Sequence, residues 1–244
     1  MKTKSISLLV SDTIGKVSGE YFIPAKTTCI ITLAHGAGAG MHHPFMTALA
    51  NALAEENIAT LRFNFPFIEN KKGRPDLPAV AHKTIEAAIS DAQKTFPSLP
   101  LFISGKSFGG RMSSQYLATH ESPSVKGIIF YGFPLHAPGK PLTDRAEHLK
   151  DVKQPMLFLS GTRDEFATLD LLENVSSSLA NATLIKIEGA NHSFKAGKQN
   201  TMPMLVNFTK DWIEKIIGGE IRVGEKTTTS AEIDVMILAE NCKG

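Results

Sequence analysis

The stretch LFISGKSFGGRMSS, residues 101–114, decides the fold. It begins with a short apolar run that is typical of a buried strand, and from Gly110 onward it is typical of a helix. The pentapeptide GKSFG, residues 105–109, lies between the two. This is G-x-S-x-G on a strand–turn–helix, where a sharp turn exposes a serine hydroxyl at the start of a helix. Because so sharp a turn crowds the residues two before and two after the serine, we expect glycine at both positions.

The same residues also resemble the end of a phosphate-binding loop, because residues 105–107 match the last three positions of G-x-x-x-x-G-K-[ST]. That motif requires a glycine where this chain has Pro100, and a glycine-rich loop where it has the apolar residues 101–103. The sequence therefore favours a nucleophilic Ser107 over nucleotide binding.

The composition is that of an ordinary globular protein. Of the 244 residues, 42% are hydrophobic and 20% are charged, and the formal net charge is +2. These values predict a large domain with a sizeable core and give no basic footprint for nucleic acid. No stretch approaches the length of a membrane span, and the apolar run after Lys2 and Lys4 is too short for a signal peptide. We therefore expect neither a nucleic-acid nor a membrane partner.

The two cysteines, Cys29 and Cys242, do not indicate a disulfide framework. Cys29 lies in an apolar run and is expected to be a reduced core residue, so we predict a reducing, cytoplasmic compartment. The histidines match no metal-site spacing, and no cysteine or carboxylate set completes one. We predict neither a metal nor another cofactor, and no pattern predicts an oligomeric state.

Buried strands alternate with helices from Cys29 onward, which predicts a mostly parallel sheet of about eight strands with helices on both faces. An antiparallel pair at residues 5–11 and 17–24 precedes this alternation. The later strands are expected at residues 29–34, 58–63, 101–104, 125–131, 155–160 and 183–188. The helices are expected at residues 44–56, 79–96, 144–150, 169–179 and 201–217, with one more from Gly110; residues 64–78 are expected to be irregular.

The alternation ends at Gly218 and Gly219, which mark the boundary between a domain of residues 1–218 and a C-terminal extension of residues 219–244. The extension is expected either as two further strands, around residues 221–223 and 233–238, or as a loosely held tail.

A serine hydroxyl becomes a strong nucleophile when a base accepts its proton and a third group orients the base. In one class of serine enzymes the order along the chain is serine, acid, histidine. Here Ser107 is followed by Asp164, in GTRDEF, and by His192, in GANHSF. Each follows an expected strand, so all three should meet at the edge formed by the carboxyl ends of the parallel strands. Glu165 is the adjacent alternative acid, and Asp164 could instead cap the next helix.

Two backbone N–H groups should stabilise the oxyanion of such a reaction. Phe108, directly after the nucleophile, supplies one, and the loop HGAGAG, residues 35–40, supplies the other. Ala37 is the expected donor and Gly38 the alternative, with His35 holding the loop in place. The residues expected to line an acyl pocket are Phe67, Phe133, Leu135 and Phe166.

Several motifs together resemble the α/β-hydrolase superfamily: HGAGAG (35–40), RFNFPF (62–67), SGKSFGGRM (104–112), HAPGKP (136–141), DRAEHL (144–149), SGTRDEF (160–166) and GANHSF (189–194). More narrowly, they are similar to a small group that includes the testis-expressed α/β-hydrolase-like protein, a related subunit of the NSL chromatin complex and bacterial relatives. Dienelactone-hydrolase-like enzymes are broader neighbours. The resemblance covers about residues 5–218.

The resemblance implies an α/β-hydrolase fold with Ser107 as nucleophile, Asp164 as orienting acid and His192 as base. Dienelactone hydrolases use a cysteine nucleophile, so the serine argues against their particular substrate. Arg62, Arg111, Arg145 and His148 match recurrent positions and are expected to form ion pairs that hold loops.

Only residues 132–154 separate the strands expected at 125–131 and 155–160, where lids are usually inserted. We therefore expect a minimal lid and a small-molecule acyl substrate. A non-catalytic interaction module on the same fold is the alternative, and a lyase or perhydrolase with the same triad is not distinguished by the sequence.

Overall fold

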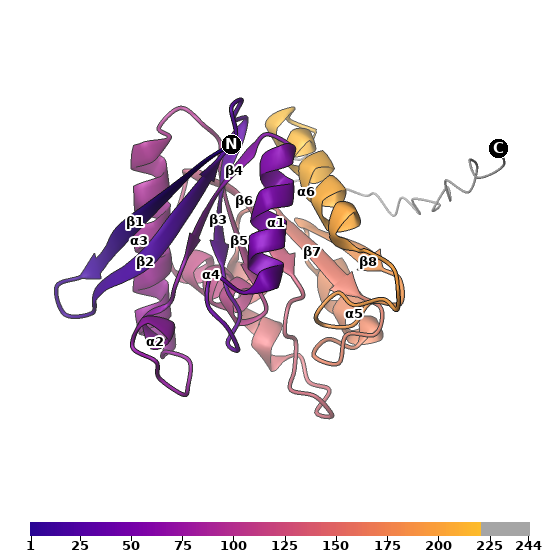
Figure 1. Cartoon of the computed structure of the whole chain (residues 1–244). Coiled ribbons are helices and arrows are strands. Elements are labelled where there is room, and N and C mark those ends of the chain that lie inside the picture. The colour runs from indigo at the N-terminus through magenta and orange to yellow at the C-terminus, as the bar shows by residue number, and fades with distance from the viewer. Residues whose placement is uncertain (221–244) are drawn as a thin grey trace, which may run out of the picture.

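Eight strands form one sheet in the order β1-β2-β4-β3-β5-β6-β7-β8. The computed structural model describes residues 1–220 (Figure 1). β1 and β2 pair antiparallel, as do β2 and β4, and all later neighbours are parallel. The strands are β1 (Lys2–Ser11), β2 (Gly15–Ile23), β3 (Cys29–Ala34), β4 (Ile58–Phe63), β5 (Leu101–Lys106), β6 (Val125–Tyr131), β7 (Met156–Gly161) and β8 (Ala182–Ile187). The predicted mostly parallel sheet is therefore confirmed.

The central strands are continuous apolar runs because helices cover both faces of the sheet. Every residue of β3, β4 and β7 is buried. Cys29, at the start of β3, is a buried free thiol, as expected. At the sheet edge β1 is mostly exposed, which fits a strand covered on one side only.

Helices lie on both faces of the sheet (Figure 1). α1 (Pro44–Glu55) and α6 (Met202–Ile217) lie together on one face, where Leu49 and Trp212 are among the buried side chains. α3 (Pro78–Thr95) and α4 (Phe108–Thr119) cover the other, with Ile85 and Met112 in the core. The remaining helices are α2 (Pro66–Glu69), η1 (Asp144–Asp151) and α5 (Leu169–Ser178).

The connection between β6 and β7 contains a single 3₁₀ helix, η1, and no inserted domain. η1 packs on α4, where His148 Nε2 lies 2.8 Å from Ser114 Oγ. This short connection agrees with the expected minimal lid. α2 lies within residues 64–78, which were expected to be irregular, and it is a single short turn of helix that begins at Pro66. Proline at the first helical position is favourable, because its missing N–H has no partner there anyway.

The predicted loop-holding role of the arginines is correct for Arg62 and wrong for two others. Arg62 is buried, forms an ion pair with Glu20, and donates hydrogen bonds to Met41 O and Thr47 Oγ1 at 2.9 and 2.7 Å. It ties β2 and β4 to α1 and to the loop before it. Arg111 and Arg145 form no ion pair with any residue from 1 to 220. His148 acts through its hydrogen bond to Ser114 instead of an ion pair.

The predicted C-terminal extension, with its candidate strands and Cys242, lies outside the described residues apart from Gly219 and Glu220. Among residues 1–220, no helix combines the length and apolar character needed to cross a membrane.

Candidate active site

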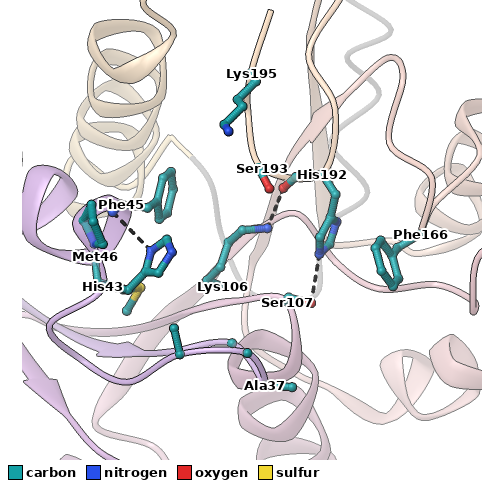
Figure 2. Close-up of a pocket in the computed structure, with 14 residues that line it drawn as sticks. Ala37, His43, Phe45, Met46, Lys106, Ser107, Phe166, His192, Ser193 and Lys195 are labelled. Atoms are coloured by element: carbon teal, nitrogen blue, oxygen red, sulfur yellow. Dashed lines mark hydrogen bonds between the residues drawn. The ribbon is translucent and has the colours of Figure 1, made fainter.

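Ser107 occupies the sharp turn between β5 and α4. Its backbone has φ 51° and ψ −115°, a positive-φ conformation that is strained for a residue with a side chain. The surrounding structure holds this strain: Ser107 N donates to Tyr131 O, and Arg111 N donates back to Ser107 O at 3.1 Å. The turn directs the serine side chain into a cavity at the carboxyl ends of the strands (Figure 2).

The glycines on either side of the serine are required by close backbone approach. A Cβ atom on Gly105 would lie 2.2 Å from Gly110 N. A Cβ atom on Gly109 would lie 2.5 Å from Ala34 O and 2.6 Å from His35 O. The predicted crowding is therefore present. For Gly109, however, the nearest atoms belong to Ala34 and His35 at the end of β3, and not to Gly105.

Ser107, His192 and Asp164 form a continuous hydrogen-bonded chain. His192 Nε2 lies 2.9 Å from Ser107 Oγ (Figure 2). On the other side of the ring, His192 Nδ1 lies 2.8 Å from Asp164 Oδ2. A carboxylate only accepts hydrogen bonds, so the imidazole carries its proton on Nδ1 and leaves Nε2 free to accept one from the serine. This is the geometry that a nucleophile, a base and an orienting acid require.

The loops after β7 and β8 are tied together, which brings the acid to the histidine. Arg163 N donates to Ala190 O at 2.9 Å, and Gly189 N donates to Thr162 Oγ1 at 2.9 Å. Asp164 has no side-chain exposure, and its Oδ1 also accepts from Phe166 N at 2.8 Å. The acid is thus fixed from both sides.

The structure also bears on the two alternatives to Asp164 as the acid: that Asp164 caps a helix, and that Glu165 is the acid instead. Asp164 does not cap the next helix, because α5 begins at Leu169 with Thr168 as its N-cap. Glu165 Oε2 accepts from the backbone N of His192 at 3.3 Å and does not contact the imidazole. Glu165 therefore supports the backbone of the histidine loop, and Asp164 is the residue that binds the imidazole ring.

His35 holds the glycine-rich loop, as predicted. Its Nδ1 donates to Gly36 O at 2.7 Å, and its Nε2 accepts from Phe65 N at 3.0 Å. The ring is fully buried, and burial lowers the pKa of His35 to about 4, so it stays neutral. A Cβ atom on Gly36 would lie 3.7 Å from Ser107 Cβ, so this loop packs directly against the serine.

The expected oxyanion donors both lie next to Ser107. Ala37 and Gly38 line the cavity beside Ser107. Phe108 begins α4, where the first backbone N–H groups of a helix have no partner within the helix. No acceptor among residues 1–220 is hydrogen-bonded to the backbone N–H of Ala37 or Phe108. Both donors are therefore available to a ligand.

The cavity that contains Ser107 and His192 has a volume of about 690 Å³. Of the four residues expected to line an acyl pocket, Phe166 does so: its ring lies over the His192 imidazole, with centroids 4.4 Å apart. The full lining consists of Gly36, Ala37, Gly38, Ala39, His43, Pro44, Phe45, Met46, Lys106, Ser107, Phe166, His192, Ser193 and Lys195.

The other three expected pocket residues do not line this cavity and belong to the core. Phe67 packs between His35 and Phe108. Phe133 packs against the ring of Phe130, and Leu135 is fully buried. Each turns back into the core on the α3–α4 face of the sheet, because an apolar side chain gains more from burial there than from a solvated cavity.

Sequence reasoning missed the wall of the cavity opposite Phe166. This wall comes from the start of α1, with His43 and Phe45, and from the loop before α6, with Lys195 (Figure 2). A signal was present, because α1 follows the glycine-rich loop directly and its first turn must lie at the same edge. Within residues 1–220, no three His, Cys, Asp or Glu side chains are grouped so as to bind a metal ion.

Comparison with known sequences finds a family model described as an alpha/beta hydrolase domain, which matches residues 27–215. Curated relatives from two strains of Mycobacterium tuberculosis, provisionally named phosphoribosyl transferases, are each 26% identical over 202 residues. The match covers 80% of this chain but only 43% of those proteins, so the chain spans less than half of their length.

Solved structures share the fold. A dienelactone hydrolase from Anabaena variabilis superposes with a TM-score of 0.71 at 19% identity, over 87% of this chain and 96% of that one. Est1E from Butyrivibrio proteoclasticus superposes with a TM-score of 0.68 at 16% identity, over 88% of this chain and 99% of that one. Both matches extend over nearly the whole of the compared protein, so the fold is shared in full.

Proposed function

Since the chain belongs to the α/β hydrolase domain family, we propose that it is a serine hydrolase that cleaves an ester or a related acyl bond. The observation that carries this proposal is the distance of 2.9 Å between Ser107 Oγ and His192 Nε2, inside a cavity that both residues line. A serine and a histidine in this relation need only an acyl carbon within reach of the hydroxyl to react.

In the first step, His192 Nε2 accepts the Ser107 proton as the serine oxygen attacks the substrate carbonyl. The imidazolium that forms is stabilised by the Asp164 carboxylate on Nδ1, which also keeps the ring in the required tautomer. The tetrahedral oxyanion accepts hydrogen bonds from the N–H groups of Phe108 and Ala37, neither of which has an acceptor among residues 1–220.

In the second step, His192 returns the proton to the leaving group, and an acyl-enzyme remains on Ser107. Water then enters, His192 accepts its proton, and hydroxide attack releases the acid. Phe166, whose ring lies beside the imidazole at a tilt of 40°, shields one side of that ring from solvent. No step requires a cofactor, so the proposed reaction uses only side chains and water.

We propose a small or accessible substrate, because the connection between β6 and β7 contains no inserted lid domain. The cavity volume of about 690 Å³ lies within the usual range for small-molecule sites. On the quoted motifs, we place the chain in the group around the testis-expressed hydrolase-like protein and the NSL-complex subunit. We do not extend the transferase name of the mycobacterial relatives, because that name applies to much longer proteins.

The test is labelling with a fluorophosphonate probe, which reacts with an activated serine. The wild-type protein should be labelled and Ser107→Ala should not, while Ser104→Ala, which alters a buried serine on β5, should be labelled like wild type. Turnover of short-chain p-nitrophenyl esters and thioesters should disappear in His192→Ala. Equal labelling of wild type and Ser107→Ala would contradict the proposal.

The second candidate is a non-catalytic interaction module. It predicts no labelling and no turnover of any ester. A lyase or perhydrolase would retain labelling of Ser107 and would be recognised from its products, because a perhydrolase forms a peracid when hydrogen peroxide is supplied. Three hydrogen-bonded side chains, two of which line the cavity, favour the hydrolase, since an interaction module needs none of them.

A further inference from the structure

The Lys106 side chain is a cation that the proposed reaction does not use. It precedes the nucleophile and lines the cavity, where its Nζ donates a hydrogen bond of 2.6 Å to the backbone carbonyl of His192 (Figure 2). Burial lowers the pKa of Lys106 to about 8, so the ammonium is mostly protonated at neutral pH. An ammonium has three N–H donors, and the bond to His192 occupies one of them.

No carboxylate within the described part of the chain forms an ion pair with this ammonium. The two acidic groups whose charge acts on it, Asp164 and Glu165, are bound to the ring and to the backbone N–H of His192. The other neighbour is the Phe194 ring, whose centroid lies 5.3 Å from Nζ. A partly buried cation without a close anion is costly, and an anionic ligand in the cavity would offset that cost.

The rest of the cavity has the same sign of charge. None of the residues that line it is an aspartate or a glutamate. Lys195, on the loop before α6, is exposed and extends toward the same space (Figure 2). His43 Nδ1 accepts from Phe45 N, which leaves its Nε2 as a further donor at the rim. The cavity therefore offers an anion several donors and no repelling carboxylate on its wall.

We infer that the substrate carries a carboxylate close to the acyl bond that is cleaved, and that Lys106 and Lys195 bind it. One partly buried ammonium with one exposed neighbour fits a single negative charge. This inference rests on the proposed hydrolase function and names its substrate class. Lys106 would then have two contacts at once, the His192 carbonyl and the substrate carboxylate, and would place the substrate beside the base.

The test compares esters that differ only in charge. Monophenyl adipate carries a carboxylate on the acyl side, and the phenyl ester of adipamic acid is its neutral amide of the same length. A second pair, 4-acetoxybenzoate and 4-acetoxybenzamide, places the charge on the leaving group. The quantity measured is the ratio of kcat/KM for the anionic and neutral members, and we expect about 10-fold or more in at least one pair for wild type.

Variants of the lysines distinguish binding of the substrate from support of His192. Lys106→Met loses the bond to the His192 carbonyl, which should slow the cleavage of both esters of a pair. Only the loss of carboxylate binding changes the ratio of kcat/KM between the two esters, and this ratio should fall to about one. Lys106→Arg keeps the charge and should restore part of the preference. Lys195→Gln should reduce the ratio by a smaller factor, because its charge is solvated.

The matched control is Lys198→Gln, which removes an exposed lysine that does not line the cavity and should leave the ratio unchanged. A wild-type ratio of one or less in both pairs would overturn the inference. So would a ratio that survives Lys106→Met, because Lys106 would then serve His192 alone.

Binding to Ser107→Ala separates this inference from the proposed function. Calorimetry with the same ester pairs measures affinity without turnover. If the anionic ester binds more tightly and Lys106→Met abolishes the difference while wild type hydrolyses nothing, carboxylate binding by Lys106 stands and the hydrolase proposal falls. If wild type is labelled by fluorophosphonate and cleaves neutral esters but shows no preference, the inference falls alone.

Discussion

The Nδ1 atom of His192 lies 2.8 Å from Oδ2 of Asp164, whose side chain is completely buried. An asparagine at this position keeps the shape but presents an amide that does not hold the proton on Nδ1. We therefore expect Asp164→Asn to lower kcat for a reactive ester by about 10³- to 10⁴-fold with little change in KM.

Glu165→Gln is the matched control for the acid, because it changes the adjacent carboxylate, which contacts only the backbone of the histidine loop. We expect it to change kcat by less than about 10-fold. Stopped-flow or p-nitrophenolate absorbance measures both variants. A larger loss of kcat in Glu165→Gln than in Asp164→Asn would show that Glu165, and not Asp164, is the orienting acid.

The sharp turn at Ser107 predicts a stability effect at Gly105. A methyl group there would lie 2.2 Å from Gly110 N, which is backbone and cannot move aside without shifting α4. Gly105→Ala should lower the free energy of unfolding by about 3 kcal/mol or more, or prevent folding. Gly38→Ala, where no atom lies within 4 Å of the new methyl, should unfold at nearly the wild-type urea concentration. Equal midpoints for the two variants would contradict the crowding argument.

Acid should weaken the fold through His35. Burial lowers the pKa of His35 to about 4, below its ordinary value of 6.5, so the unfolded chain binds more protons between these two values. Stability therefore rises with pH through this window and is lost as the pH falls from about 6.5 to about 4. His148, with a pKa also lowered to about 4 by burial and the nearby Arg111, acts in the same direction.

Removing the titrating group should flatten this dependence. Between about pH 7 and about pH 5, wild type should lose about 1–2 kcal/mol more unfolding free energy than His35→Gln, measured by urea denaturation at each pH. His42→Gln, at an exposed position in the same loop region, should follow wild type. If His35→Gln loses as much as wild type, the buried imidazole is not the group that titrates.

The sequence predicted best what depends on local spacing. G-x-S-x-G between a strand and a helix identifies the turn at Ser107 because its backbone geometry allows few residues at the neighbouring positions. The alternation of buried strands and helices identifies the parallel sheet, and parallel strands place the residues after them at one edge. Asp164 and His192 were therefore expected beside Ser107 although they lie far apart in the chain.

The direction of side chains in the loops was not predictable in the same way. Phe133 and Phe166 both follow strands, yet the first turns into the core and the second packs against the His192 ring. Which way each points depends on the path of its loop, and no periodic pattern records that path. The hydrogen-bond partner of Lys106 could not be predicted for a related reason. It is a backbone carbonyl, which every residue carries, so no residue type in the sequence identifies it.

The burial of Lys106 gives a final prediction, with the opposite proton balance at alkaline pH. Burial lowers the pKa of Lys106 from 10.5 to about 8, so between these values the folded protein has released a proton that the unfolded chain still binds. Stability then rises with pH in this window, because the cost of a buried ammonium is relieved as it becomes neutral. Lys106→Met has no such charge to relieve. The unfolding free energy of wild type relative to Lys106→Met should therefore increase by up to about 2 kcal/mol between about pH 7.5 and about pH 10. Other titrations are common to both proteins and cancel in this difference, and Lys198→Met, at an exposed position, should show no increase. A difference that stays constant with pH would mean that the Lys106 ammonium is already compensated inside the free protein, and would count equally against its need for an anionic ligand.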